Sequence, residues 1–265
     1  LGGRCHDRLQ AYANGLYGGA VTPEDYAERA RAVVAAGYRG LKLDPFGVAW
    51  KRMSNEEMAR SESIVASVRQ AVGDDVEIMV EVHGRLAPDV AKEVADRLTK
   101  YQPTWLEEPV APERLDLLAE VKRSTSIPIA AGERLYTLSD FARLIENRLV
   151  DVVQMDVAHC GGILMGKKIA ALAEPHDVVF APHASVGPVS LAAALHLDMC
   201  CNNFFRQENF GEHDVDYRDD LVSGWNRFED GYFTLDECPG LGLELNDNVI
   251  AAHPYEPHTF PSLWD

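Results

Sequence analysis

The sequence lacks a long hydrophobic run, a low-complexity segment and a surplus of basic residues. No apolar run approaches the ~20 residues that a membrane-spanning helix needs, and no secretory signal is visible at the N-terminus. The 25 basic residues face 42 acidic ones, for a formal net charge of −17, which disfavours nucleic acid or an anionic membrane as partner. These absences favour a cytoplasmic protein that acts on a small molecule, and an anionic substrate then needs a local cation to attract it.

Cysteine is also scarce, with five residues in the chain. None of them forms a Cys-x-x-Cys pair of the zinc-binding type, and the adjacent Cys200 and Cys201 are poorly placed to bridge. Reduced, mostly buried thiols are the simplest interpretation.

Short apolar runs alternate with helical patterns along most of the chain. The run at 105–110 reaches the carboxylates Glu107 and Glu108, and the run at 127–133 ends at Glu133. An apolar run, a helix and a second apolar run are typical of two parallel strands joined by a crossover helix. The predicted strands are residues 9–14, 39–43, 76–82, 104–106, 127–131, 150–155, 178–181 and 203–206.

The repeat of roughly 25 residues predicts an α/β fold, a (β/α)7β TIM-like barrel, since βα units of this size close into a barrel of ~250 residues. An open doubly wound sheet is the alternative, but no Gly-x-Gly-x-x-Gly follows any strand. We expect the barrel to cover residues 1–208. Residues 209–265 are acidic and rich in Gly, Pro and aromatics, and they lack the repeat. We expect this segment to pack on the barrel or on a capping region.

Ionisable residues end one predicted strand after another. A single such residue usually caps a helix or forms a surface ion pair, but a series of them is harder to explain in that way. Parallel strands deliver their carboxyl ends to one side of the sheet, where α/β folds bind ligands. The residues concerned are Lys42, Asp44, Glu81, His83, Glu107, Glu133, Asp156, His183 and Glu208.

Two groups within this set point to specific chemistry. Glu81, Glu107 and Glu133 end three consecutive strands, and their oxygens suit the octahedral shell of Mg²⁺. Asp156 and His183 end neighbouring strands, where a carboxylate orients an imidazole and raises its basicity, as a general base requires.

The spacing of these motifs resembles the enolase superfamily in its mandelate racemase-like branch, and most closely the acid-sugar dehydratases of the galactonate and gluconate type. The resemblance extends over residues 1 to about 245. The motifs that carry it are Leu41-Lys42-Leu43-Asp44-Pro45-Phe46, Glu81-Val82-His83-Gly84-Arg85, Trp105-Leu106-Glu107-Glu108-Pro109, Ala131-Gly132-Glu133-Arg134, Asp156 with Cys160-Gly161-Gly162, Pro182-His183 and Glu208.

The resemblance implies a magnesium-dependent dehydratase of a sugar-derived (aldonic) acid, which yields a 2-keto-3-deoxy acid. It selects Glu107 over Glu108 as metal ligand, beside Glu81 and Glu133. In this scheme His183, paired with Asp156, removes the α-proton, and His83 protonates the departing hydroxyl. Glu208 hydrogen-bonds the developing enediolate, and Lys42, Asp44 and Arg85 contact the substrate.

The chain departs from the family pattern at Asp44, where racemases carry a second lysine, and at Glu81, where many relatives have Asp. The first departure disfavours racemisation through two bases. Family members also carry an N-terminal capping domain, which we do not expect within this chain, and a homo-oligomer is implied. Epimerisation or cycloisomerisation of a similar acid, and an inactive metabolite-binding or assembly barrel, remain alternatives. The other histidines are expected to be surface or structural residues: His6, His159, His176, His196, His213, His253 and His258.

Overall fold

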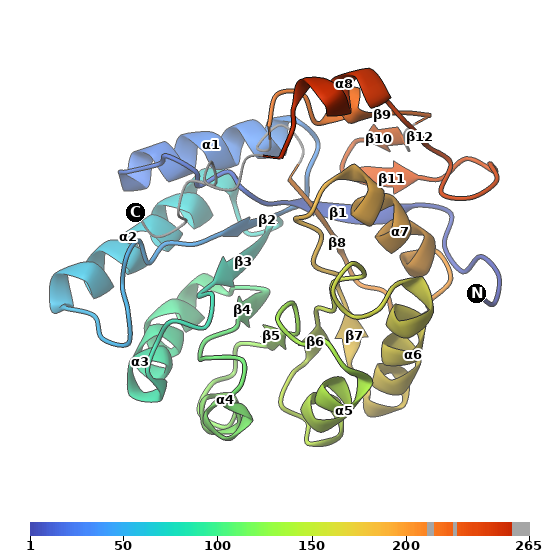
Figure 1. Cartoon of the computed structure of the whole chain (residues 1–265). Helices are drawn as coiled ribbons and strands as arrows, with labels where there is room; N and C mark the ends of the chain where they lie inside the picture. The colour runs from blue at the N-terminus through green and yellow to red at the C-terminus, as the bar shows by residue number, and fades with distance from the viewer. Residues whose placement is uncertain (211–214, 225–226, 256–265) are drawn as a thin grey trace.

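The computed structural model describes residues 1–210, 215–224 and 227–255, and it shows an α/β fold in which helices surround a curved sheet (Figure 1). The first eight strands are β1 (Leu9–Ala13), β2 (Gly40–Leu43), β3 (Glu77–Glu81), β4 (Trp105–Glu107), β5 (Ile129–Ala131), β6 (Val152–Val153), β7 (Val179–Phe180) and β8 (Gln207–Asn209). The helices between them are α1 (Pro23–Ala35), α2 (Asn55–Val72), α3 (Pro88–Leu98), α4 (Leu115–Lys122), α5 (Leu138–Glu146), α6 (Ile163–Ala173) and α7 (Pro188–Asp198). Short 3-10 helices follow α3 (Thr99–Tyr101) and α6 (Glu174–His176).

The sheet follows the order of the chain from β1 to β7, with every neighbouring pair parallel, and β8 pairs with the other side of β1. The sequence placed the last strand at 203–206, whereas β8 lies at Gln207–Asn209. Residues 203–205 instead bond to β7, because Phe180 N donates to Asn203 O at 3.0 Å and Phe205 N donates to Phe180 O at 2.9 Å. Among the described residues, a parallel β-bridge between Phe180 and Phe204 thus joins β7 to the segment that leads to β8.

Helix starts follow the local signals in the sequence. The Thr22 side chain accepts from Asp25 N while the Asp25 carboxylate accepts from Thr22 N, so both ends of a capping box are present at α1. Ser54 and Glu57 form the same arrangement at α2. Both helices therefore begin at a residue whose side chain caps the first turn.

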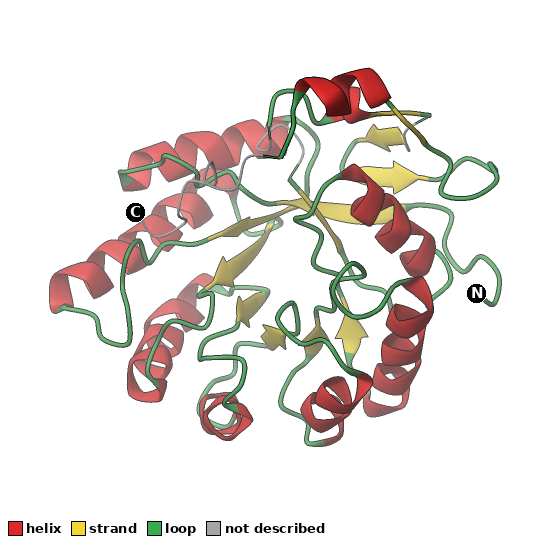
Figure 2. Cartoon of the chain, viewed as in Figure 1, coloured by secondary structure: helices red, strands yellow, loops and turns green. Residues whose placement is uncertain are grey.

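The core has two layers. A large apolar cluster fills the space between the sheet and the surrounding helices, and the helices lie outside the strands (Figure 2). A smaller cluster lies on the opposite, inner face of the strands and consists of Tyr12, Met79, Trp105, Ala130, Val152 and Ala181. Packing on both faces explains why these strands read as continuous apolar runs. Among the described residues, no helix is long and apolar enough to cross a membrane.

The C-terminal segment is more regular than the sequence indicated. Strands β10 (Arg227–Glu229) and β11 (Tyr232–Thr234) form an antiparallel pair, and β11 also pairs antiparallel with the first two residues of β1, Leu9 and Gln10. A second small sheet joins β9 (Val222–Ser223) to β12 (Glu244–Leu245) near a 3-10 helix (Asp219–Leu221) and α8 (Asp247–Ala252). His213 and His258 lie outside the described residues.

Candidate active site

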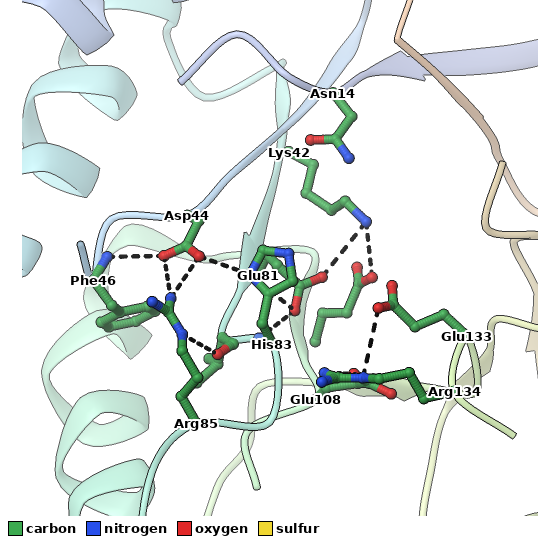
Figure 3. Close-up of polar contacts among 12 residues, drawn as sticks. Asn14, Lys42, Asp44, Phe46, Glu81, His83, Arg85, Glu108, Glu133 and Arg134 are labelled. Carbon is green, nitrogen blue, oxygen red and sulfur yellow. Dashed lines mark hydrogen bonds and ion pairs between the residues drawn. The ribbon is translucent and has the colours of Figure 1, made fainter. Parts of the chain in front are cut away.

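Several ionisable residues that end or follow strands lie close together, as Figure 3 shows for Lys42, Glu81 and Glu133. Lys42 on β2 lies at their centre, within 3.6 Å of Glu81 on β3, 2.8 Å of Glu107 on β4 and 2.7 Å of Glu208 on β8. The four side chains come from strands that are far apart in the sequence, yet all are buried. This contact network sets the position of the remaining groups.

Three carboxylates form a cluster that can hold a divalent cation. Glu81 ends β3, Glu107 ends β4 and Glu133 follows β5, and one oxygen from each lies within 4.8 Å of the other two. Burial and the neighbouring Glu81 raise the pKa of Glu107 to about 8. Among the described residues, Glu81 Oε2 has no hydrogen-bond partner. Crowded, buried carboxylate oxygens with a vacant acceptor fit a hard, oxygen-seeking cation.

The orientation of Glu107 is fixed from two sides. Lys42 Nζ donates to its Oε1 at 2.8 Å, and the indole Nε1 of Trp105 donates to its Oε2 at 2.8 Å. Burial alone lowers the pKa of Lys42, but the surrounding carboxylates raise it well above its usual value. Sequence reasoning missed Trp105, although its position two residues before Glu107 on the same strand directs both side chains to the same face.

His183 and Asp156 form a close pair on neighbouring strands. His183 Nδ1 lies 2.7 Å from Asp156 Oδ2, which leaves Nε2 facing Glu133 Oε2 at 3.5 Å. Burial alone lowers the pKa of His183, whereas Glu208, the hydrogen bond to Asp156 and Glu133 raise it to about 10. A cation among the carboxylates offsets their charge and moves this pKa back down.

His83 has a carboxylate partner of its own. Its Nδ1 lies 2.7 Å from Asp44 Oδ2, and its backbone is in the left-handed region, with φ 54°. Arg85 Nη2 donates to Asp44 Oδ1 at 2.6 Å, and Phe46 N donates to the same oxygen at 3.0 Å. Burial alone lowers the pKa of His83, but Glu81 and Asp44 raise it to about 9. Asp44 and Arg85, expected at the substrate, are thus buried against each other and His83.

Glu208 is held as a charged acceptor. Asn14 Nδ2 donates to its Oε1 at 2.7 Å, and Ala184 N donates to its Oε2 at 2.7 Å. Burial alone raises the pKa of Glu208, but Lys42 and His183 lower it to about 2. Asn14, at the end of β1, was missed from sequence because Asn followed by Gly reads as an ordinary turn.

Glu107 and Glu108 have different neighbours. Glu107 belongs to the acidic cluster with Glu81 and Glu133. Glu108 accepts from Arg134, whose Nε lies 2.6 Å from Glu108 Oε2 (Figure 3). Arg134 Nε is also 3.7 Å from Glu133 Oε1, so one guanidinium faces both acids. Burial and Glu133 raise the pKa of Glu108 to about 7.

His159, expected to be a surface or structural residue, lies beside His183. Its Nδ1 is 3.8 Å from Asp156 Oδ2 and 3.2 Å from the backbone oxygen of Glu133. Its ring centroid is 6.1 Å from those of both His183 and Tyr136. The signal that could have found it is its position three residues after Asp156, in the loop that leaves β6.

Comparisons with a protein-family model and with individual known proteins agree with each other. Residues 25–249 match the family model described as Enolase C-terminal domain-like. The chain is 38% identical over 261 residues to the D-gluconate dehydratase of Thermoproteus tenax, covering 98% of this chain and 52% of that protein. It is 37% identical over 256 residues to the D-gluconate/D-galactonate dehydratase of Picrophilus torridus, covering 97% and 65%. The chain thus spans about half to two thirds of the length of these curated relatives.

Solved structures give the same result. A putative mandelate racemase/muconate lactonizing enzyme from Burkholderia SAR-1 superposes with a TM-score of 0.92 at 37% identity, covering 98% of this chain and 66% of that one. A putative dehydratase from Salmonella enterica serovar Typhimurium superposes with a TM-score of 0.91 at 36% identity, covering 95% and 68%. The compared region therefore has the same fold as these two structures and is 36–37% identical to them in sequence.

Proposed function

The chain belongs to the Enolase C-terminal domain-like family, and from this premise we propose that it carries the active site of a magnesium-dependent dehydratase of sugar-derived acids. An aldonic acid loses its α-proton and its β-hydroxyl as water, and the resulting enol becomes a 2-keto-3-deoxy acid. The observation that carries the proposal is a pair of carboxylate-bound histidines at the two ends of one acidic cluster, with His83 beside Glu81 and His183 beside Glu133. The two relatives described above are a D-gluconate dehydratase and a D-gluconate/D-galactonate dehydratase, which agrees with this proposal.

His183 is the proposed base. Asp156 accepts the Nδ1 proton, so the lone pair of the neutral ring is at Nε2, on the side of the acidic cluster. The α-proton transfers to this nitrogen, and the electron pair of the C–H bond moves towards the carboxylate. His183 can remove the proton only from an α-carbon that lies next to Nε2. The contact with Asp156 holds the ring in the orientation that this requires.

His83 is the proposed acid. Its Nδ1 is engaged by Asp44, so Nε2 is the nitrogen that donates to the departing hydroxyl. The C–O bond breaks, the hydroxyl takes the Nε2 proton and leaves as water, and the α,β double bond forms. Asp44 and Arg85 act here by holding His83 in place.

Mg²⁺ is the cation we propose for Glu81, Glu107 and Glu133. The fit is supported by the oxygen-only donor set and by the buried Glu81 Oε2, which has no hydrogen-bond partner among the described residues. When bound, the ion stabilises negative charge on the substrate carboxylate. Lys42 adds a fixed positive charge to the same place, and Glu208 and Asn14 keep its ammonium there.

The contacts of Asp44 disfavour a racemase or epimerase that uses two bases. The residue that replaces the second lysine is bonded to Arg85 and His83, so it presents no base of its own. His83, held by Asp44 at Nδ1, is the second histidine of the site, and dehydration needs one base and one acid rather than two bases.

We also propose that the parallel strands β1 to β8 close into a (β/α)7β barrel through the Phe180–Phe204 bridge, and that a further domain covers its open end. Large apolar side chains in the loops at this end are exposed, among them Val48, Trp50 and Tyr136. Such residues are usual at a contact surface. A homo-oligomer is part of the same proposal, and light scattering that gives a mass near 29.3 kDa for this chain would count against it.

The test is a screen of the protein with Mg²⁺ against a panel of aldonic acids, with 2-keto-3-deoxy products followed by NMR. We expect product from at least one acid, none after His183→Asn, and normal turnover after His176→Gln, which removes a histidine from the 3-10 helix before β7. Epimeric acids without keto product would favour the epimerase. Binding of acids without any conversion would favour the inactive barrel.

A further inference from the structure

A second group of possible ligands lies next to the proposed base. One atom each from Asp156, His159 and His183 lies within 4.8 Å of the other two. Asp156 Oδ2 is 2.7 Å from His183 Nδ1 and 3.8 Å from His159 Nδ1. The proposed reaction uses Asp156 and His183 but leaves His159 without a role.

We infer that Asp156, His159 and His183 form a binding site for a divalent transition-metal ion, Zn²⁺, and that an ion bound there prevents His183 from acting as a base. The second half of the inference rests on the proposed function. The first half rests on geometry alone.

The donor set distinguishes this site from the acidic cluster. Two imidazole nitrogens and one carboxylate oxygen suit zinc and related metals, whereas oxygen-only sets suit magnesium. The three carboxylates of Glu81, Glu107 and Glu133 contain no nitrogen. The acidic cluster of Glu81, Glu107 and Glu133 therefore favours a hard cation. The group of Asp156, His159 and His183 favours a softer one.

The distances are close to those that zinc requires. Zn–N and Zn–O bonds of about 2.0–2.2 Å place tetrahedral ligand atoms roughly 3–3.5 Å apart. The observed separations of 2.7 and 3.8 Å lie on either side of this range, so small side-chain rotations suffice. The backbone oxygen of Glu133, 3.2 Å from His159 Nδ1, is a nearby fourth donor. The His159 side chain is 35% exposed, which gives an ion a route from solvent.

The ion would change the proton arrangement of His183. In the Asp156 pair, Nδ1 carries the proton and Nε2 is the acceptor. A metal on Nδ1 needs the lone pair of that nitrogen, so the single proton of the neutral ring moves from Nδ1 to Nε2. Nε2 can no longer accept the α-proton, so zinc and catalysis exclude each other.

The binding test is a calorimetric titration of Zn²⁺ into the Mg²⁺-saturated protein. We expect one site in the wild type and in His176→Gln, and at least ~10-fold weaker binding in His159→Gln, since losing even an outer-sphere partner typically costs 10–100-fold. Glu133→Gln, titrated without Mg²⁺, should keep zinc binding, because only its backbone oxygen is near His159. Equal affinity in His159→Gln, or loss of zinc binding in Glu133→Gln, would place the ion in the acidic cluster and overturn the assignment.

Two further measurements separate binding from function. Co²⁺ used as a probe should give a visible absorption band in the wild type that is lost in His159→Gln, with unchanged circular dichroism showing that the variant is folded. Zinc should inhibit turnover by the wild type but not by His159→Gln, which should have normal activity without zinc. Inhibition that persists in His159→Gln would refute the blocking role. A chain without dehydratase activity would refute the proposed function, while the titration would still decide the metal site.

Discussion

Asp44 Oδ2 lies 2.7 Å from His83 Nδ1, and this contact has the same length and the same ring nitrogen as the one between Asp156 and His183. The two pairs occupy different strands and border different members of the acidic cluster. Each carboxylate leaves the Nε2 of its histidine as the nitrogen available for a substrate. The Asp44–His83 pair has an additional partner. The buried guanidinium of Arg85 lies against Asp44 and neutralises its charge.

Removing the charge of Asp44 should therefore damage the acid step and spare the base step. We expect Asp44→Asn to slow dehydration by about 10²-fold, within the range for loss of general acid catalysis. Exchange of the substrate α-proton with deuterated solvent, followed by NMR, should continue because Asp156 and His183 are unchanged. Asp89→Asn is the matched control, since Asp89 pairs with Arg52 on the surface. Equal loss of exchange and dehydration would show that Asp44 does not act through His83.

The two histidines should fail in different ways. His183→Asn should stop α-proton exchange and dehydration together, because no base remains to form the intermediate. His83→Asn should slow dehydration yet permit exchange, because His183 can return the proton it has taken. Each loss should be about 10²–10⁴-fold in rate. The opposite pattern would exchange their roles and place proton removal on the His83 side.

Magnesium binding should release protons. Without a cation the pKa of Glu107 is about 8, so this carboxyl is largely protonated at pH 7, and an ion must displace its proton. Affinity should consequently rise with pH between 6 and 8, by up to ~10-fold per unit for each proton released. Calorimetry in buffers of different ionisation enthalpy measures the release. Glu133→Gln should abolish binding and exposed Glu113→Gln should not, and unchanged binding in Glu133→Gln would refute the ligand set.

The strand-end residues were predictable because their positions follow from chain geometry. Once the apolar runs are interpreted as parallel strands, Glu81, Glu107 and Glu133 must reach the same side of the sheet. The contacts among Lys42, Glu107 and Glu208 follow from the same rule. No knowledge of loop conformation is needed for this part of the site.

The remaining features depend on packing that a linear pattern does not encode. Asn14 acts through Glu208, a partner 194 positions away. The position of His159 depends on the path of the loop after β6, and Asp44 is bonded to Arg85, which a linear pattern does not reveal. The strand β11 was missed because its alternation is short and its partner is the first strand of the chain.

Asp198 is a buried acid without an evident partner. It ends α7, is fully buried, and both of its carboxylate oxygens lack a hydrogen-bond partner among the described residues. Burial raises its pKa well above the usual value, so the folded protein keeps this carboxyl protonated. In the unfolded chain the same group ionises above about pH 4.

This difference sets the sign of a pH effect on stability. Above pH 4 the unfolded state binds fewer protons at Asp198 than the folded state, so this residue contributes a loss of stability as the pH rises towards its folded pKa. Asp198→Asn has nearly the same shape and no titration, so it should escape the loss. Its melting temperature relative to wild type should increase between pH 5 and pH 8, by about 2–4 °C for each kcal/mol. Asp96→Asn, on the exposed face of α3, should show the same offset at both values. A constant offset for Asp198→Asn in calorimetric scans would mean that Asp198 is ionised in the folded protein and has a counter-charge.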